Sequence, residues 1–533
     1  MHRAALLLLL VGGAVVALLS YLCPAAAALT EVFSHRDWST ALLGERRVAL
    51  LWRGVRVAAQ AALVAQVIGA LLAATWATRG PGRLAAVAAW VGGVVLLSPP
   101  YLYAYAWSLV LLPAGVATGA QFDEAWRHWL VTEARATWCL ATWLAPLAAA
   151  VLLAGWRRSG VASFSLALLD ARPIRAVRAA ALPAMRAWVL ASLLICTALA
   201  LTEFSVCHLC LVQTWNTEIL AEVQQTPASG RALLLAWPLL ALVVLLAGAT
   251  WPFRRVLRAL PDDLLSGDDA ALRAPHASRS GLLAGAALIA IAIELAPTLV
   301  LAAHFRDPAA LLRVWSVYPD DWRDGALGAA VTFALALALA LAADAARAWA
   351  DAPGPRRAGA LPIVARAALD LLLAFALLAA LAPPVLVGDA LAAAYAALPW
   401  LGDGGLAISL AAVARFGFVP LLMLRSSGAA RELAELAALD GAGPAVAFWR
   451  VRLPRVAPLA LGGAALVGLL GFTEVAATQL VRAPGVGSVA LTLLNAIHFG
   501  RDDVVIAASL VVFAAVGAGA ALALAIVRRT RSR

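Results

Sequence analysis

Two glutamates follow threonines inside long apolar runs, as Thr202-Glu203 and Thr473-Glu474. A carboxylate in such a segment costs free energy unless it is paired or used, so each is a candidate contact for a cationic solute. The alternative is structural, with each glutamate ending a helix at the headgroup level. Water or the neighbouring threonine would then satisfy the carboxylate.

Arg415 is a third charged residue in an apolar run. A guanidinium in that setting should not face lipid and needs an acidic partner. Asp370 and Glu294 are similarly embedded, so either could pair with Arg415. A structural ion pair is the favoured role, and contact with a solute is the alternative.

Other clusters of potential ligands carry a weaker signal. Residues 207–210, Cys-His-Leu-Cys, lack the second ligand pair that a four-ligand metal site needs. The stretch His498 to Asp503 is typical of an exposed turn, and the pairs Asp262-Asp263 and Asp268-Asp269 are typical of a solvated linker. We therefore expect neither a metal site nor a catalytic residue in this chain.

The basic residues exclude several kinds of chemistry, because all 41 of them are arginine. Without lysine the chain has no Walker-type nucleotide loop ending in Gly-Lys-Ser/Thr. A Schiff-base lysine is excluded for the same reason. If ATP drives this protein, another chain must bind it, and we expect no cofactor on this one.

The elements that position these residues follow from composition. Of the 533 residues 64% are apolar and 13% charged, whereas soluble domains are about half apolar and a quarter charged. The chain is therefore expected to be an all-α integral membrane protein that contacts the lipid bilayer and no nucleic acid. At about 20 residues per crossing, the apolar runs predict about twelve membrane-spanning helices. Their centres lie near residues 16, 65, 92, 145, 196, 242, 292, 336, 376, 414, 466 and 515.

The distribution of arginine predicts the orientation of these helices. With both termini in the cytoplasm, 26 of the 41 arginines fall on the cytoplasmic side and 13 on the other. This bias agrees with the excess of basic residues in cytoplasmic loops of membrane proteins. The first apolar run, from Ala4 to Ala28, is long enough to remain as an uncleaved first helix.

An internal repeat organises the chain. Leu182-Pro183 and Glu203 recur with the same spacing as Leu453-Pro454 and Glu474. Upstream, the Pro-Pro pair at residues 99–100 has a counterpart at residues 383–384. Six helices per half give two copies of the same orientation, which is a parallel repeat.

This repeat divides the chain into three parts. The first repeat covers residues 1–260, a cytoplasmic linker covers 261–280, and the second repeat covers 281–533.

The loop over residues 426–455 is the most informative segment. Glu435 and Ala437 belong to a short amphipathic helix, which Asp440-Gly441 should end. Leu453-Pro454 opens the next membrane helix, since proline is favoured in a first turn.

These residues resemble the coupling loop of binding-protein-dependent ABC importer permeases. Its pattern is Glu-Ala-Ala, three residues, Gly, nine residues, an aliphatic residue, one residue and Leu-Pro, with Leu436 and Val451 as apolar replacements here. A degenerate version occupies residues 157–186. There Asp170 and Leu182-Pro183 match, but Ala171 replaces the glycine and no glutamate precedes it.

Nearly the whole chain is similar to the fused, two-copy permeases of the iron(III) importer group. The resemblance implies two separate ABC ATPase subunits that use ATP, an extracytoplasmic solute-binding protein, and a place in the bacterial inner membrane. It also implies a translocation path, for which Glu203, Glu474 and Arg415 are candidates. Ferric iron is the implied solute, although thiamine and phosphonate permeases share this layout.

Two other classes remain as alternatives. A secondary transporter of the major facilitator type also has two parallel six-helix halves, but the loop from Arg79 to Arg83 lacks the acid typical of that class. A polytopic membrane transferase would need clustered carboxylates, and Asp320-Asp321 is the modest candidate.

Overall fold

The computed structural model describes residues 2–34, 42, 44–79, 83–111, 125–225, 230–250, 281–351, 360–396, 398–402, 404–425, 433, 436–437, 439–500 and 502–531. Within these ranges the regular elements are helices and no strand occurs, which confirms the predicted all-α fold for this part of the chain. The predicted linker over 261–280 lies outside the described residues.

The first half begins with one continuous helix, in which the π-helical turn η1 joins α1 to α2. Its elements are α1 (His2–Ala17), η1 (Leu18–Leu22), α2 (Cys23–Ser34), α3 (Glu45–Arg79), α4 (Arg83–Leu97), α5 (Pro100–Leu111), α6 (Ala125–Trp129), η5 (Leu130–Ala134), α7 (Arg135–Gly155), η6 (Trp156–Gly160), α8 (Val161–Ala167), α9 (Pro173–Ala176), η7 (Val177–Ala181), α10 (Leu182–Thr202), α11 (Ser205–Leu209), α12 (Trp215–Gln225) and α13 (Arg231–Ala249).

The second half follows a similar order of long and short helices. Its elements are α15 (Gly281–His304), α16 (Ala309–Val317), α17 (Pro319–Asp351), α18 (Ala360–Leu381), α19 (Pro384–Tyr395), α20 (Pro399–Gly402), α21 (Leu406–Phe416), α22 (Phe418–Arg425), α24 (Pro444–Val446), η12 (Ala447–Arg452), α25 (Leu453–Phe472), α26 (Ala476–Val481), α27 (Val489–His498) and α28 (Asp502–Arg531).

The described helices include ten that are long and apolar enough to cross a membrane, and twelve if two bent pairs each count as one span. All twelve predicted centres fall within these spans. The prediction of about twelve spans is therefore confirmed at the upper of the two counts.

The third predicted helix is not one straight crossing, because α4 and α5 meet at an angle of 97°. The break falls at Ser98-Pro99, and Pro100 opens α5. Proline lacks a backbone N–H and clashes with the preceding turn, so two in succession end a helix. The same break separates α18 from α19 at Pro383-Pro384.

The order of elements after each Leu-Pro pair recurs in the two halves. In the first half a long helix ends at Thr202, and the short helices α11 and α12 and the long helix α13 follow. In the second half α25 is followed by α26, α27 and α28 in the same way. The two Leu-Pro pairs are thus followed by the same order of long and short helices.

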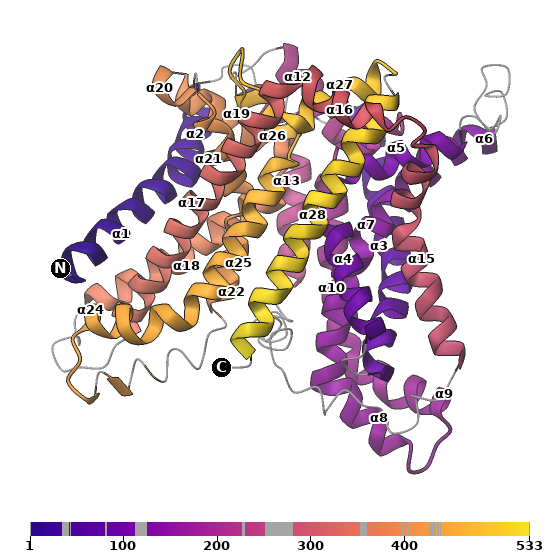
Figure 1. Cartoon of the computed structure of the whole chain (residues 1–533), viewed down its shortest axis with the longest axis horizontal. Coiled ribbons are helices and arrows are strands. Elements are labelled where there is room, and N and C mark those ends of the chain that lie inside the picture. The colour runs from indigo at the N-terminus through magenta and orange to yellow at the C-terminus, as the bar shows by residue number, and fades with distance from the viewer. Residues whose placement is uncertain are drawn as a thin grey trace.

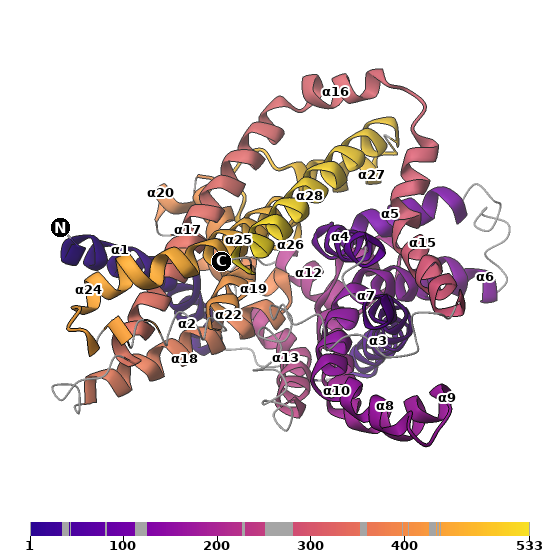
Figure 2. The ribbon, with the colours of Figure 1, turned by 60° about the horizontal axis from the view of Figure 1, so that its bottom comes forward.

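The first helix of each half packs against the other half. The α1 helix lies along α17, whereas α15 lies against α3 and α5 (Figure 2). Two hydrogen bonds join the N-terminal helix to the second half: the buried Tyr21 hydroxyl donates to the carbonyl of Val413 at 2.8 Å, and the Tyr395 hydroxyl donates to that of Leu19 at 2.5 Å. The halves are therefore interlocked rather than simply apposed.

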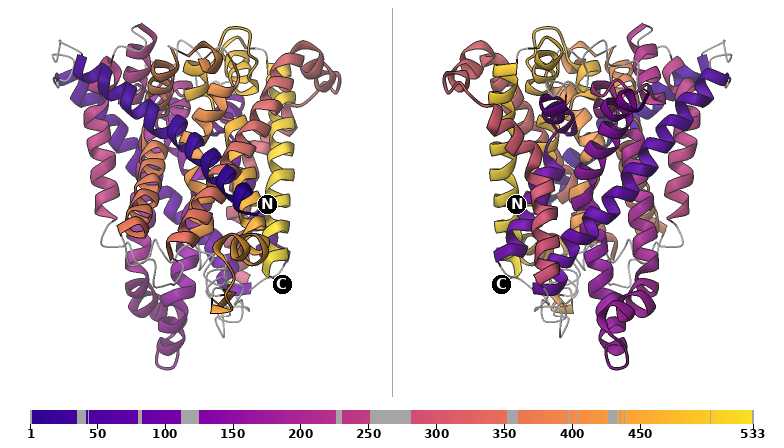
Figure 3. Two further views of the ribbon diagram at one scale, coloured as in Figure 1. Left: turned by 90° about the vertical axis from the view of Figure 1, so that its left-hand side faces the viewer. Right: turned by 90° about the vertical axis from the view of Figure 1, so that its right-hand side faces the viewer.

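Both predicted coupling loops lie at the same end of the helix bundle, with α8 and α9 in one and α24 in the other (Figure 1). The hairpin that carries α8 and α9 extends beyond the ends of the long helices (Figure 3). The elements α12, α16, α20 and α27 lie at the opposite end (Figure 1).

Gly13 tests the packing of α1 on α17. A Cβ atom at this position would overlap the Cβ of Ala342, whereas a Cβ at Gly12 would meet nothing within 4 Å. We expect Gly13→Val to destabilise the protein by about 1–3 kcal/mol through overpacking and to lower its melting temperature in detergent. The matched variant Gly12→Val should leave the melting temperature unchanged; equal effects of the two variants would contradict this packing.

Candidate translocation site and coupling surfaces

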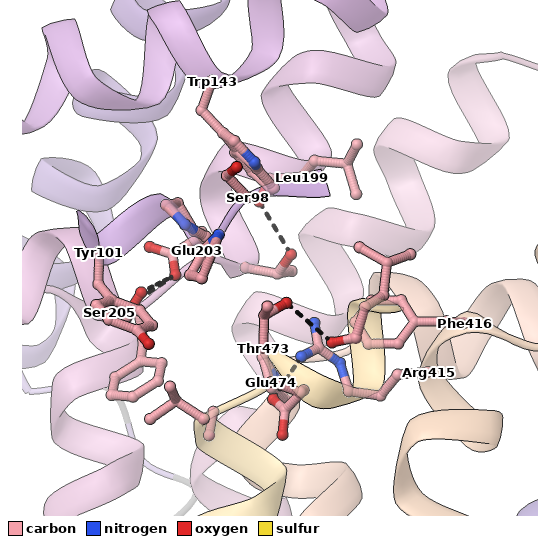
Figure 4. Close-up of a pocket in the computed structure, with 18 of the residues that line it drawn as sticks. Ser98, Tyr101, Trp143, Leu199, Glu203, Ser205, Arg415, Phe416, Thr473 and Glu474 are labelled. Atoms are coloured by element: carbon pink, nitrogen blue, oxygen red, sulfur yellow. Dashed lines mark hydrogen bonds and ion pairs between the residues drawn. The ribbon is translucent and has the colours of Figure 1, made fainter. Parts of the chain in front are cut away.

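A cavity of about 110 Å³ lies between the two halves and brings the three predicted charged residues together (Figure 4). Glu203, Glu474 and Arg415 all line it. The surrounding residues come from equivalent elements of both halves. They are Leu96, Leu97, Ser98, Pro99, Pro100, Tyr101, Trp143, Leu199, Thr202, Phe204, Ser205, Ala380, Pro384, Phe416, Leu470, Thr473, Val475 and Ala476.

Glu474 is buried and accepts several charge-assisted hydrogen bonds. The Arg415 guanidinium donates to its Oε1 at 2.7 Å, with the two side chains 17% and 3% exposed. The backbone N–H groups of Ala477 and Thr478 donate to the carboxylate at 3.1 and 2.9 Å, and the Thr478 hydroxyl donates at 3.0 Å. Glu474 therefore caps α26 as well as pairing with Arg415.

The predicted partners of Arg415 are wrong. Asp370 instead accepts hydrogen bonds from Arg347 at 2.8 Å and pairs with Arg425 at 3.2 Å. Glu294 is buried in α15 and neither of its carboxylate oxygens has a hydrogen-bond partner among the described residues. Arg415 ends up beside Glu474 because α21 packs against α25 and α26, which its position in the sequence does not reveal.

Glu203 makes the corresponding cap in the first half. Its Oε1 accepts from the backbone N–H and hydroxyl of Ser205 at 3.0 and 2.5 Å, and its Oε2 accepts from the N–H of Val206 at 2.9 Å. The hydroxyls of Thr202 and Thr473 donate to carbonyls of their own helices instead. The predicted satisfaction of each glutamate by its neighbouring threonine is therefore wrong.

The two halves differ in the residue that faces the negative charge of these carboxylates. On α21 the cavity is lined by Arg415, whereas on α7, the helix before the first coupling loop, it is lined by Trp143. The Trp143 indole N–H donates to the carbonyl of Leu96 at 3.3 Å. Two carboxylates and one guanidinium thus line the cavity, which leaves a formal charge of −1 if both glutamates are ionised.

The second predicted coupling loop has the glycine turn that its sequence predicts. Gly441 has φ +83°, a conformation that favours glycine, and the N–H of Ala442 donates to the carbonyl of Ala437 at 2.9 Å. Asp440 is exposed beside this turn. Leu453-Pro454 opens α25 as predicted. Glu435 lies outside the described residues.

The first predicted coupling loop forms a helical hairpin of its own. Phe164 of α8 is buried against Ala176 and Ala181. The chain reverses between α8 and α9, where Asp170 is exposed and the N–H of Ala171 donates to the carbonyl of Ala167 at 2.9 Å. The turn is closed without the glycine, and Leu182-Pro183 opens α10.

Two leucines are exposed at matching places in both loops, which the sequence reasoning missed. Leu166 and Leu169 are 69% and 79% exposed, and Leu436 and Leu439 are 55% and 76% exposed. In each loop the second leucine directly precedes the aspartate, Asp170 or Asp440. The signal was available as the shared pattern Leu-Ala-x-Leu-Asp. Apolar side chains exposed at a polar tip are typical of a protein interface.

A buried ion pair that the sequence reasoning also missed anchors the second loop. Arg452 donates from Nε and Nη2 to the two carboxylate oxygens of Asp344 at 2.7 and 2.6 Å, and the side chains are 6% and 2% exposed. Asp344 lies in the apolar helix α17. An acidic residue in a membrane span needs a partner, so its position in the sequence was a signal that could have predicted an ion pair.

The remaining candidate ligands do not form a metal cluster in the part of the chain that the structure describes. His208 and His498 contact each other across the halves with ring centroids 5.3 Å apart and ring planes tilted by 42°. Burial lowers the pKa of His208, and the nearby His498 lowers it further. Asp321 accepts hydrogen bonds from Ser488 and Thr492, so this carboxylate serves to cap α27.

These observations define a polytopic α-helical membrane protein with a charged cavity between its halves. No family model, curated protein or solved structure matches the chain.

The ion pair between Arg415 and Glu474 gives a stability prediction. Removing one partner of a buried pair leaves the other charge uncompensated, so Arg415→Met should destabilise the protein by about 3–5 kcal/mol. The double variant Arg415→Met/Glu474→Gln should recover most of that loss in thermal unfolding. As a control, Arg313→Met removes an exposed pair with Asp307 and should cost at most about 1 kcal/mol. Additive losses in the double variant would contradict the pairing.

Proposed function

We propose that this chain is the membrane permease of an ATP-driven, binding-protein-dependent importer. The observation that carries the proposal is the pair of loops at one end of the bundle, each presenting two exposed leucines followed by an aspartate. Such tips are suited to docking into a groove on another protein. The family pattern around Gly441 supports an ATPase subunit as the occupant, and the two loops would take one subunit each.

The mechanism that we propose is alternating access at the cavity between the halves. A loaded binding protein would dock at the end opposite the coupling loops, and the ATPase subunits would close on ATP. Closure would move the two loops and separate the halves at the cavity. Since the chain lacks lysine, hydrolysis falls to the partner subunits, and this chain itself catalyses no covalent step.

The cavity supports a cationic solute. One guanidinium and two carboxylates leave an excess negative charge when both glutamates are ionised, and the aromatic side chains of Trp143, Tyr101 and Phe204 also line the cavity. Ferric iron remains the solute that the family resemblance favours. Passage between the halves needs no tight site, which fits a cavity that is small in this conformation.

The alternatives have less support from the described residues. A transferase would use Asp321 in chemistry, but this carboxylate is occupied as a helix cap. A secondary transporter would leave the exposed leucines of two cytoplasmic loops without a role.

Docking of the ATPase subunits can be tested by co-purification from native membranes. Gly441→Asp places a side chain and a charge at a position with φ +83°, and Glu435→Arg reverses a charge of the family pattern. Both variants should lose at least about 90% of the co-purifying ATP-binding subunit, equivalent to about 1.4 kcal/mol of binding free energy. Gly443→Asp, where a Cβ also meets nothing within 4 Å and φ is −64°, is the control. Solute uptake that ignores ATP and follows a proton gradient would contradict the proposal.

The role of Glu203 can be tested by neutralising it. Glu203→Gln keeps an oxygen that can accept the α11 cap but removes the charge that Arg415 does not balance. We expect uptake of radioactive ferric iron, in cells that express the whole transporter, to fall at least tenfold with normal assembly. In Asp370→Asn, which removes a half-exposed pair with Arg347 away from the cavity and from the end where the binding protein would dock, uptake should be unchanged. Unchanged uptake in Glu203→Gln would exclude this carboxylate from the path.

A further inference from the structure

The long helix α17 is tied at its cytoplasmic end to the second coupling segment, residues 444–452. The tie is the bidentate pair between Asp344 and Arg452, in which both side chains are almost fully buried. Arg452 is the last residue before Leu453-Pro454. Bidentate guanidinium–carboxylate pairs fix direction as well as distance, so movement of this segment must displace α17 or break the pair.

At its other end α17 is tied to the outer loop, residues 482–488. Asp324 accepts a hydrogen bond from the N–H of Gly487 at 2.8 Å, and Asp321 accepts from the N–H of Ser488 at 2.9 Å. Gly487 lies directly on the start of α17, because a Cβ there would be 2.6 Å from the Cα of Asp321. The outer loop is therefore fixed to the helix backbone itself.

Close packing on α25 stiffens α17 between these two ties. A Cβ at Gly468 would be 2.9 Å from the carbonyl oxygen of Ala329, and one at Gly471 would be 3.4 Å from the Thr332 side chain. Asp321 and Asp344 are separated by 23 residues, which is about 34 Å along a helix. The two helices thus form one rigid body that joins the two ends of the bundle.

The first half lacks both parts of the cytoplasmic tie. Ala181 stands before Leu182-Pro183 where Arg452 stands before Leu453-Pro454, and α3 has no acid after Glu45. Within the first loop, Phe164 packs on Ala176 and Ala181, and the Ser159 hydroxyl donates to the carbonyl of Ala184 at 3.2 Å. These contacts join residues of the loop to the start of α10 and do not reach α3.

From these contacts we infer that Asp344 and Arg452 are positioning residues that make α17 carry movement of the second coupling segment to the outer loop. The inference rests on the proposed function, because the ATPase subunits drive that movement. Under this inference, the second half transmits the ATP-driven closure of the ATPase subunits to the outer face. The first loop docks without this transmission.

The test measures movement of the outer loop directly. Spin labels are attached at Gln213→Cys and Pro484→Cys, which are exposed on the outer loops of the two halves, in a Cys23→Ser background where the other cysteines are buried. The distance between labels is measured in the purified complex with its ATPase subunits, without nucleotide and after trapping with ATP and vanadate. The complex with the native pair should show a shift on trapping.

The decisive variant is Asp344→Leu/Arg452→Met, which replaces the ion pair with apolar side chains and is expected to fold normally. We expect the trapping-induced shift to fall at least twofold, with ATP hydrolysis retained. Asp344→Glu, which conserves the charge, should keep more of the shift. Asp370→Asn removes a half-exposed pair with Arg347 of the same helix and is the matched control. A full shift in the double variant would overturn the inference.

The two proposals fail in different ways. If the chain is not an ABC permease, no ATP-binding subunit co-purifies with the native chain. If only the inference on α17 is wrong, the subunit co-purifies and hydrolyses ATP while the double variant moves like the native protein.

Discussion

Helices that begin inside the bundle leave backbone N–H groups without partners, and beside the cavity two carboxylates accept such groups. Glu203 and Glu474 each stand between a long helix and a short one and accept the N–H groups of the short one. Because these breaks face each other across the halves, the caps also bring negative charge into the cavity. Each glutamate can therefore cap a helix and still line the cavity, so the structural interpretation and the solute-contact interpretation do not exclude each other.

The two halves have different residues at equivalent positions, and these differences predict different roles for the two halves. The second half balances its glutamate with Arg415, closes its loop with Gly441 and anchors it with Arg452. At the corresponding places the first half has Trp143, Ala171 and Ala181. The first half thus lines the cavity with Glu203 and Trp143 where the second half has Glu474 and Arg415, and Ala181 cannot form the ion pair that Arg452 makes with Asp344.

Sequence alone predicted the spans and the turn at Gly441, because these depend on local apolarity and backbone conformation. It did not predict the helix breaks at the two Pro-Pro pairs, although the missing proline N–H groups were a local signal for them. The sequence placed Glu203 and Glu474 at helix ends, but it did not reveal which residues donate hydrogen bonds to them. Arg415 reaches Glu474 across 59 residues, and Arg452 reaches Asp344 across 108. Such contacts depend on which helices pack together, and the crossed packing of α1 and α15 has no local signal.

The central claim is that both coupling loops bind an ATPase subunit, and site-specific photocrosslinking in native membranes tests it most directly. A photoreactive side chain at the exposed positions Leu169 and Leu439 should attach each loop to a protein with a Walker-type nucleotide site, and one at Leu211 on the opposite end should not. Both crosslinks should disappear when the ATPase is absent. If neither loop forms a crosslink to an ATP-binding protein, the account is contradicted.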